Sequence, residues 1–478
     1  MLSRRQIMAG ALLPAAAVMA RAGEIGPAPS GRALFDSHTD DPYRLAARAF
    51  VWGYPLVRAA QLRINTTRPD DPYSPRPPQV AGAPLNAIGH ATRLSDPTTR
   101  LGVAPNNDTL YSLAWLDLSQ GPFVLESPDF GDRYYVFQFG QADSSADRSL
   151  GHRTHGGQLP PVFIHGPDFT AATPPGMVAI AARYRYLMIA GRILVTGADD
   201  LPAVWALQKR IRLRTEVDYR ADAPSPNPPP AQRRLIDPAR SAPKALEFLE
   251  MLGAVLQDLG LRPEDKAIVE SLGGIGLNEE HGFLTDGLGP AWQSALAEGL
   301  AAGEAMVRAK TYDLGRKING WSINYAGARF GDDYLLRAAV AMDQIYIVEP
   351  EAALYPSGRV DSDGAALDGR NAYRIRFAAG ELPPVGAFWS ITLYYAKGFM
   401  VPNEIDRWAI GDRTPGLVFG PGQSLELRVQ HVRPGGVLAA NWLPAPEEPF
   451  MLLMRLYEPK PAILSGAWVP PKIERIAN

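Results

Sequence analysis

The segment from residue 383 to residue 407 places the strongest constraint on the fold, because it contains an aromatic and β-branched run with the two-residue period of a β-strand. One set of alternating positions in this run is apolar and consists of Trp389, Ile391, Leu393 and Tyr395. The other set carries hydroxyls and rings and consists of Phe388, Ser390, Thr392 and Tyr394. A charged loop follows the run. The segment therefore predicts either one wall of a ligand site or an ordinary sandwich strand with its exit turn.

Further short strand patterns occur in both halves of the chain. In the first half they cover residues 109–118, 123–125, 133–139, 161–165, 177–181 and 184–195. In the second half they cover residues 373–377, 424–432 and 450–457. Turn-forming residues separate these patterns at short intervals, which is typical of antiparallel sheets. We therefore expect one β domain over residues 41–197 and a second β domain over residues 351–470.

Between the two β regions, apolar positions recur at helical spacing. These stripes cover residues 245–259, 292–310 and 332–347. An earlier helix is expected to begin at Pro42, because proline suits the first turn of a helix. The sequence thus predicts an α+β protein. Its helical section covers residues 198–350, and its leading helix belongs to the first β domain.

Composition and the N-terminus exclude several function classes. The chain has no cysteine, which excludes disulfides, thiol nucleophiles and cysteine-ligated metals. Its net charge is −2, with basic and acidic residues mixed along the chain, and this argues against nucleic-acid binding. Residues 1–22 are typical of an export signal, because Arg4 and Arg5 precede an apolar run that is too short to span a membrane. We expect a periplasmic or secreted protein without a membrane span in the mature chain, exported by a twin-arginine or a Sec route.

Motifs for metals and nucleotides are weak. His152 and His155 form the only close histidine pair, and Asp143 or Asp147 could complete a metal site with them. Glycine-rich surroundings favour a solvated loop instead, so we assign no metal ligand. The sequence contains no Gly-x-Ser-x-Gly elbow and no phosphate-binding loop. It identifies no cofactor, and it leaves open a catalytic site built from scattered carboxylates, arginines and tyrosines.

Polar and aromatic residues gather in three segments of the sequence. They are Asn106, Asp108 and Tyr111 in the first, Arg133, Tyr135 and Gln138 in the second, and Trp389, Tyr394, Asn403, Arg407 and Trp442 in the third. In a structural interpretation, the first two segments supply a turn that caps the backbone and a buried Asp–Arg pair. In a functional interpretation, their Asp, Arg and Tyr side chains line a pocket that holds a polar ligand.

The same segments resemble a known pair of domains. VAPNNDTLYSLAWLDL, RYYVFQF and GHRTHG resemble the N-terminal domain of unknown function catalogued as twelve-fifty-four. AFWSITLYYAKGFMVPNEIDRWAI, NWLPAP and MRLYEP resemble the C-terminal domain catalogued as twelve-fourteen. The resemblance implies two jelly-roll-like β domains with helices between them, and no settled activity. Asn107 stands where the family commonly has Arg, and His155 stands where Thr is usual. The ligand or the site of this chain therefore differs if those positions line the family's site.

We therefore expect an exported protein with a pocket between its β domains for a small molecule or a glycan. In the leading hypothesis it is an enzyme, either a hydrolase or a lyase, and its catalytic residues are Asp108, Tyr111, Arg133, Tyr394 and Arg407. The substrate-binding residues in this hypothesis are Asn106, Tyr135, Gln138, Trp389, Asn403 and Trp442. The alternatives are a non-catalytic carbohydrate-binding or cell-envelope structural protein, and a metal-dependent enzyme built on the histidine pair. A homodimer stays open.

Overall fold

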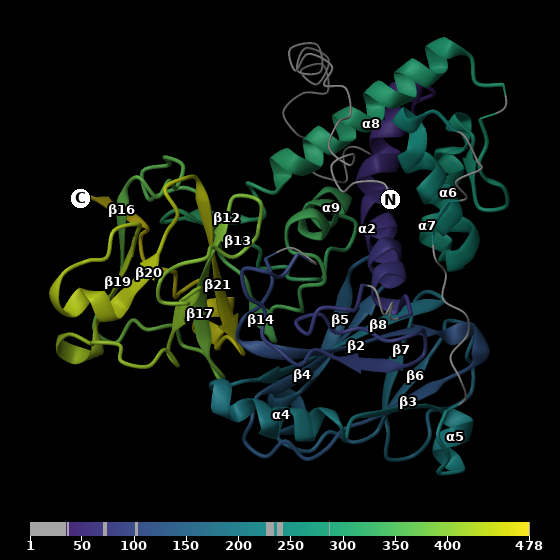
Figure 1. Cartoon of the computed structure of the whole chain (residues 1–478). Helices are drawn as coiled ribbons and strands as arrows, with labels where there is room; N and C mark the ends of the chain where they lie inside the picture. Colours follow the sequence, from purple (N-terminus) through teal and green to yellow (C-terminus); the bar gives the residue numbers. More distant parts are fainter. Residues whose placement is uncertain are drawn as a thin grey trace.

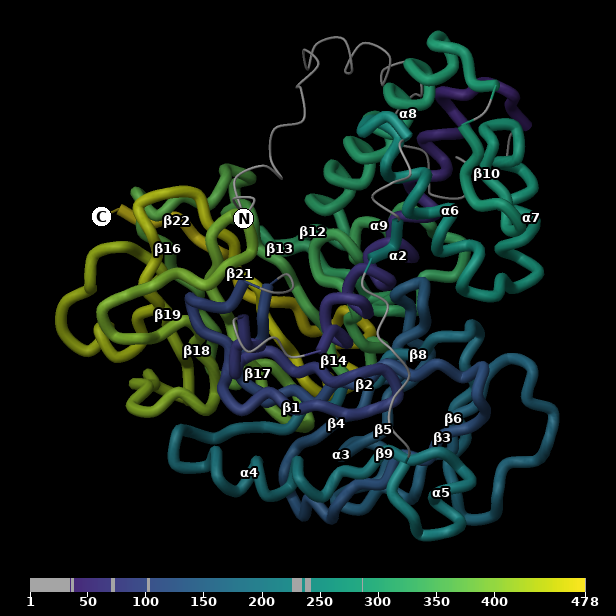
Figure 2. Tube along the Cα trace, turned by 45° about the vertical axis from the view of Figure 1, so that its right-hand side comes forward, coloured from purple at the N-terminus to yellow at the C-terminus, as the bar shows by residue number. Residues whose placement is uncertain are grey.

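The computed structural model describes residues 35, 38–69, 74–100, 104–225, 234–236, 242–285 and 287–477. The export signal expected over residues 1–22 lies outside these residues and stays a prediction. The described chain forms an N-terminal pair of β-sheets, a layer of helices and a C-terminal pair of β-sheets (Figure 1). The helices lie over the N-terminal sheets, and the C-terminal sheets stand beside both (Figures 1 and 2). The fold is therefore α+β with mainly antiparallel sheets, as the sequence predicts.

The N-terminal part is a sandwich of two sheets. One sheet has the strand order β1-β2-β8-β4-β5, and the other has the order β7-β6-β3-β9. Neighbouring strands are antiparallel except for β6 and β7. The strands are β1 (Ile88–His90), β2 (Thr109–Asp117), β3 (Phe123–Glu126), β4 (Tyr135–Gln141), β5 (Ala146–Gly151), β6 (Val162–His165), β7 (Val178–Ala181), β8 (Tyr186–Leu194) and β9 (Arg212–Thr215). The short helices are α3 (His152–His155), α4 (Leu201–Gln208) and α5 (Glu216–Arg220).

Alternation along β8 decides which residues face the sandwich and which face the helices. Ile189 and Ile193 lie in the core between the two N-terminal sheets. Met188 and Ala190 lie in the core that the larger sheet shares with the helices. Because side chains alternate along a strand, Arg192 shares the helix-facing side with Met188 and Ala190.

The helical layer is built around α2 (Pro42–Thr67), its longest helix. The layer consists of α2, α6 (Glu247–Leu259), α7 (Pro263–Ser271), α8 (Pro290–Lys310) and α9 (Tyr334–Asp343). Helix α2 packs against α6, α8 and α9, so it belongs to this layer although the sequence associates it with the first β domain. Gly299 permits the close approach of α8 to α2, because a Cβ atom at this position would lie 2.2 Å from the carbonyl oxygen of Tyr43 in α2. No helix among the described residues combines the length and the apolar character that crossing a membrane requires.

The C-terminal part also has two facing sheets. One has the order β12-β13-β15-β21-β17-β18, with β14 paired to β21, and the other has the order β20-β19-β16-β22. Its strands are β12 (Arg316–Ile318), β13 (Trp321–Ile323), β14 (Ala353–Leu354), β15 (Ser357–Gly358), β16 (Ala372–Phe377), β17 (Trp389–Tyr395), β18 (Ala409–Gly411), β19 (Leu425–Gln430), β20 (Trp442–Pro444), β21 (Phe450–Tyr457) and β22 (Glu474–Ile476). Strands β12 and β13 come from the section expected to be helical, and they extend the C-terminal sheet instead.

The two faces of β17 match the alternation of its sequence. The apolar set lies in the core between the C-terminal sheets. The hydroxyl-bearing set faces the N-terminal part of the protein. Ser390 Oγ donates to Asp108 Oδ2 over 2.7 Å, and Tyr394 Oη donates to the carbonyl oxygen of Pro105 over 2.7 Å. Strand β17, within the segment 383–407, therefore provides contacts between the two β parts.

A buried ion pair joins the helical layer to the larger N-terminal sheet. Arg337 of α9 donates from Nη1 to Asp143 Oδ2 over 3.1 Å and from Nη2 to the carbonyl oxygen of Trp52 over 3.0 Å. Both charged side chains are almost fully buried. Burial alone raises the pKa of Asp143, but the positive charges of Arg337 and Arg183 outweigh burial and lower that pKa. The carboxylate therefore stays charged, and it needs its arginine partners.

Replacement of Arg337 by Met should destabilise the protein, because it leaves the Asp143 carboxylate buried with only weaker partners. We expect the free energy of unfolding to fall by about 3–5 kcal/mol, as it does when one partner of a buried pair is removed. The control is Arg329→Met, which removes a half-exposed pair with Glu351. That loss should stay below about 1 kcal/mol. Urea unfolding measures both values, and equal losses would contradict the importance of the buried pair.

Candidate functional site

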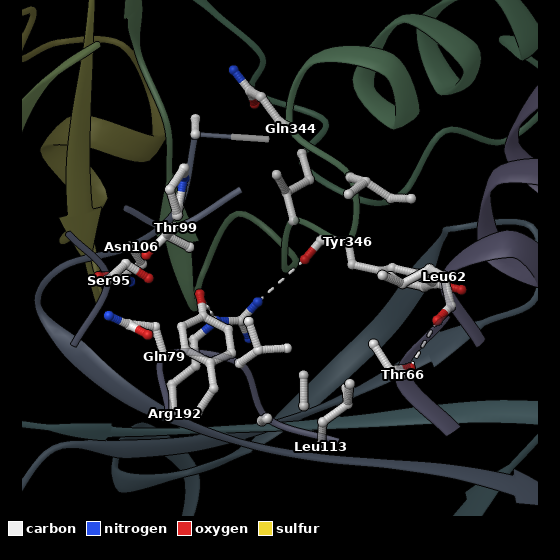
Figure 3. A pocket seen from close by; sticks show the side chains of 18 of the residues that line it. Leu62, Thr66, Gln79, Ser95, Thr99, Asn106, Leu113, Arg192, Gln344 and Tyr346 are labelled. Carbon is white, nitrogen blue, oxygen red and sulfur yellow. Dashed lines mark hydrogen bonds between the residues drawn. The ribbon is translucent and has the colours of Figure 1, made fainter. Parts of the chain in front are cut away.

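A cavity of about 200 Å³ lies where the three parts of the protein meet. Its walls come from α2, the helix-facing side of the larger N-terminal sheet, the segment after α9, and strand β21. Figure 3 shows many of these side chains from close by, with the hydrogen bond from Arg192 to the carbonyl oxygen of Tyr346 near the middle of the view. The polar lining residues are Thr66, Gln79, Ser95, Thr99, Asn106, Tyr111, Arg192, Gln344, Tyr346, Tyr355 and Arg455. The cavity thus draws its walls from segments that are far apart in the sequence.

The pairing of β2 with β8 builds the sheet side of the cavity. Tyr111 lies opposite Arg192, and Leu113 lies opposite Ala190. Since residues two apart in a strand share a face, these four side chains lie on the same side of the sheet. All four line the cavity. The sheet therefore contributes to one wall a polar pair, Tyr111 and Arg192, and an apolar pair, Leu113 and Ala190.

Arg192 is buried, at 6 % exposure, and its hydrogen bonds go to neutral oxygens. Its Nε donates to Tyr111 Oη over 3.1 Å. Its Nη2 donates to Gln138 Oε1 over 2.9 Å and to the carbonyl oxygen of Tyr346 over 3.3 Å. Its Nη1 is buried and has no hydrogen-bond partner among the described residues. A guanidinium does not lose its proton in proteins, so Arg192 carries a buried positive charge.

A second buried arginine reaches the cavity from the C-terminal part. Arg455 donates from Nη1 to Thr392 Oγ1 over 2.7 Å. Its Nη2 donates to the carbonyl oxygen of Ala104 and to Tyr394 Oη, each over 2.8 Å. Ala104 belongs to the N-terminal half of the chain, so Arg455 holds the two β parts together at the cavity wall.

The cavity has a positive electrostatic character. Burial raises the pKa of Tyr355 to about 12 and raises the pKa of Tyr346 well above its usual range. Both hydroxyls therefore stay neutral at neutral pH. The cavity-lining residues that the structure describes include no Asp, Glu or His. Arg192 and Arg455 are the charged groups of this described wall.

The structure brings four of the predicted site residues to the cavity or directly behind it. Asn106 and Tyr111 line it. Gln138 lies behind the wall and orients the Arg192 guanidinium. Tyr394 lies behind the wall and binds Arg455. Residue 108 lies between the two β parts, beside Asn106.

Asp108 joins the two β parts. Its Oδ1 accepts from Arg413 Nη2 over 2.5 Å, and its Oδ2 accepts from Ser390 Oγ over 2.7 Å. The neighbouring Asn106 donates from Nδ2 to Tyr457 Oη over 2.6 Å. Because partners occupy both carboxylate oxygens, these contacts favour the structural interpretation of Asp108 over a catalytic one.

Arg133 and Tyr135 have structural roles instead of the site roles expected for them. Arg133 forms a two-point ion pair with Asp200, with nitrogen–oxygen distances of 2.6 and 2.7 Å. The ring of Tyr135 stacks on Phe130 in the sandwich core, with ring centroids 3.8 Å apart. Alternation along β4 explains the difference, because residue 135 faces the sandwich whereas Gln138 faces the helices.

The remaining C-terminal candidates also stabilise the fold and do not line the cavity. Trp389 lies in the core between the C-terminal sheets. Trp442 is buried, and its carbonyl oxygen accepts from Arg407 Nη1 over 3.0 Å. Asn403 Oδ1 accepts from the backbone N–H of Arg407 over 3.0 Å. These bonds brace a loop at residues 403–407.

His152 and His155 do not form a metal site with other described residues. The segment expected to be a solvated loop forms the end of β5 and the helix α3. His152 Nδ1 lies 3.0 Å from Glu458 Oε1, whereas His155 Nδ1 lies 2.8 Å from Thr154 Oγ1. Within the described ranges, no three His, Asp or Glu side chains are grouped so that they could hold a metal ion.

Sequence reasoning missed Arg192, Arg455, Tyr355 and Gln344 as cavity residues. The two arginines had a recognisable signal, because each lies inside an otherwise apolar strand, YLMIAGRIL or FMLLMRLY. Burying a charge among apolar residues is costly, so such an arginine marks a special environment. Tyr355 and Gln344 lie outside the helices and strands, where no periodicity could point to them.

Comparison with known proteins identifies the two β parts. The family model described as protein of unknown function (DUF1254) matches residues 85–215, and the model described as protein of unknown function (DUF1214) matches residues 352–461. The chain belongs to the family that pairs these two domains. The first match spans β1 to β9, and the second spans β14 to β21. The cavity takes residues from both matched domains, and it takes Leu62 and Gln344 from segments that neither match covers.

Solved structures also resemble the chain. The VPA0106 protein from Vibrio parahaemolyticus has 22 % sequence identity and a TM-score of 0.64, over 91 % of this chain and 100 % of that chain. An uncharacterized protein from Burkholderia cenocepacia has 13 % identity and a TM-score of 0.43, over 96 % of this chain and 95 % of that chain. The first similarity shows a shared fold. No curated protein matches the chain.

Asp412, next to the contact between Asp108 and Arg413, should make stability depend on pH. Burial raises the pKa of Asp412 to about 6 from an ordinary value of 3.8, although the neighbouring Arg413 acts in the opposite direction. The stability contributed by the protonated carboxyl is therefore complete below about pH 4, and it is lost as pH rises through 6.

We expect Asp412→Asn to raise the free energy of unfolding by about 1–2 kcal/mol at pH 8, a value reduced for partial solvent exposure. The gain should shrink toward zero at pH 4. Urea unfolding of wild type and variant across this range measures the difference. A gain that does not change with pH would show that the carboxylate charge is not its cause.

Proposed function

We propose that the protein binds a small molecule in the cavity between its two family domains and the helical layer. The convergence of polar groups from separate parts of the chain on one largely apolar space carries this proposal. Ligand sites commonly have this composition, with an apolar lining and a few placed polar groups, and they commonly lie between domains. Leu62, Leu113 and Ile345 supply apolar surface, whereas Tyr111 and Arg192 supply polar groups.

A lyase reaction in the same cavity is the second candidate function. It is favoured by the hydrogen bond from Arg192 Nε to Tyr111 Oη, because this bond fixes the position of the tyrosine oxygen in the cavity wall. In this candidate reaction the Tyr111 oxygen takes a proton from one carbon atom of the bound molecule, a double bond forms to the neighbouring carbon, and a leaving group departs from that carbon with its bonding electrons. A hydrolase would need a carboxylate or histidine to activate water. The described lining offers neither, so it supports a lyase better than a hydrolase.

The carbohydrate-binding alternative has less support. Sugar recognition relies on aromatic ring faces that a sugar can cover, so we considered three of the aromatic residues expected at the site, Trp389, Tyr394 and Trp442. Each is at most 2 % exposed. Two sheets around one core in each β part are compatible with the jelly-roll-like sandwiches that the family resemblance implies. Export to the periplasm or beyond remains part of the proposal.

Filling the cavity provides the test of binding. Ala190→Phe places a ring in the cavity, and Ala179→Phe adds the same ring at an exposed position of β7. Ligand-observed NMR with a library of small neutral and charged compounds first identifies binders of the wild-type protein. Calorimetry then measures their affinities for both variants. We expect Ala190→Phe to weaken binding at least about tenfold, since overpacking a filled space costs about 1–3 kcal/mol.

Ala179→Phe should leave these affinities unchanged. Two outcomes would overturn the proposal: a library that contains no binder, or binders whose affinities for wild type and Ala190→Phe are equal.

A further inference from the structure

We propose that the ligand of this cavity is a small monocarboxylate with an apolar body, and that its carboxylate binds Arg192. This inference rests on the proposed function and adds the chemical class of the ligand. It follows from three observations. The first is that Arg192 lacks a carboxylate partner, the second is the charge of the cavity wall, and the third is the cavity's size.

Arg192 differs from three other deeply buried arginines of this protein, and it shares with Arg455 the lack of a carboxylate partner among the described residues. Arg337 pairs with Asp143 at 3.1 Å, Arg63 pairs with Asp258 at 3.1 Å, and Arg214 pairs with Glu126 at 2.6 Å. Arg192 is buried to the same degree, yet within the described residues it binds only a hydroxyl, an amide and a backbone carbonyl. The protein thus supplies a counter-charge to those other arginines, and its described residues supply none to Arg192.

The missing counter-charge has an energetic consequence. Burying a charge without a partner costs several kcal/mol, and neutral oxygens offset only part of that cost. The buried Nη1 atom also lacks any hydrogen-bond partner among the described residues. A bound carboxylate would supply the missing counter-charge, because it carries the opposite charge and matches the planar guanidinium in geometry.

The rest of the wall argues for an organic acid instead of an inorganic anion. The named donor atoms of Arg455 already bind Thr392, Ala104 and Tyr394. A phosphate or sulfate needs several free donors, whereas a carboxylate needs fewer. Beside the arginines, leucine, isoleucine, methionine and alanine side chains line the space. These apolar groups fit a hydrocarbon body attached to the acid group.

The volume limits the size of that body. The cavity measures about 200 Å³. An apolar cavity of about 150 Å³ in another protein holds one benzene molecule. Space therefore exists for one ring, or for a short alkyl chain, together with a carboxylate. Benzoate and hexanoate are suitable probes of this class.

The first experiment compares acids with their uncharged analogues by calorimetry on the full chain. We expect benzoate or hexanoate to bind at least about tenfold more tightly than benzamide or hexanamide, because hydrogen bonds between two charged groups are stronger than those to a neutral amide. Arg192→Gln keeps hydrogen-bond donors but removes the charge, so it should abolish this preference. Inorganic phosphate should not compete. Amides that bind as tightly as the acids, or phosphate that displaces them, would overturn the inference but leave the proposed function standing.

The second experiment needs no ligand and compares Ala190→Glu with Ala190→Gln. Residue 190 lies two positions from Arg192 on the same strand and the same face, so either side chain extends into the cavity toward the guanidinium. The two variants have the same shape and differ in charge. We expect Ala190→Glu to have the higher melting temperature at pH 7.5, because its carboxylate supplies the missing counter-charge. In an Arg192→Gln background the order should reverse.

A melting temperature of Ala190→Glu at or below that of Ala190→Gln would overturn the inference even if no ligand were known. If instead Ala190→Glu is the more stable variant but no compound of any charge binds the wild-type protein, the charge argument holds and the proposed function fails. The two experiments thus separate the two claims.

Discussion

The arrangement of the three parts depends on the cost of burying charge. Arg337 and Asp143 join the helices to the larger N-terminal sheet, and Arg413 and Asp108 join the two β parts. Three of these groups, Arg337, Asp143 and Asp108, are buried, and each would cost several kcal/mol without its partner, which is a large fraction of the stability of a typical domain. The parts can therefore associate closely only where both pairs close. These pairs also set the positions of the cavity walls, because each wall belongs to a different part.

Within this frame, neighbouring strands orient Arg192. Tyr111 on β2 and Gln138 on β4 bind it from the two strands that flank β8, and the Tyr346 carbonyl binds it from the segment after α9. A guanidinium held from three sides has little conformational freedom left to lose when a ligand arrives. Preorganisation of this kind lowers the entropic cost of binding. The same bonds that hold Arg192 in place also leave one of its nitrogen atoms without a partner.

Sequence periodicity predicted the strands well. The same periodicity indicates which residues of a strand share a face and can therefore line one site together. The alternation in β17 places Trp389 on the apolar face and Ser390 and Tyr394 on the other face, and the structure has them there. Choosing Trp389 for a site went against that alternation, as did choosing Tyr135 together with Gln138. No local pattern could show that Gln344 and Arg192 would line the same cavity, because this depends on how a helix packs on a sheet.

The arginines show most clearly where sequence and structure each contribute. An arginine inside an apolar strand can be recognised from the sequence, and it indicates that a charge will be buried. Whether the chain supplies the opposite charge depends on register and on long-range packing. Glu126 supplies the opposite charge to Arg214. The two residues lie on the paired strands β3 and β9, and the register of this pairing brings their side chains together. The strands that flank Arg192 supply the Tyr111 hydroxyl and the Gln138 amide instead of a carboxylate. Since the described wall provides no anion, we propose that the counter-charge of Arg192 is a carboxylate that enters the cavity.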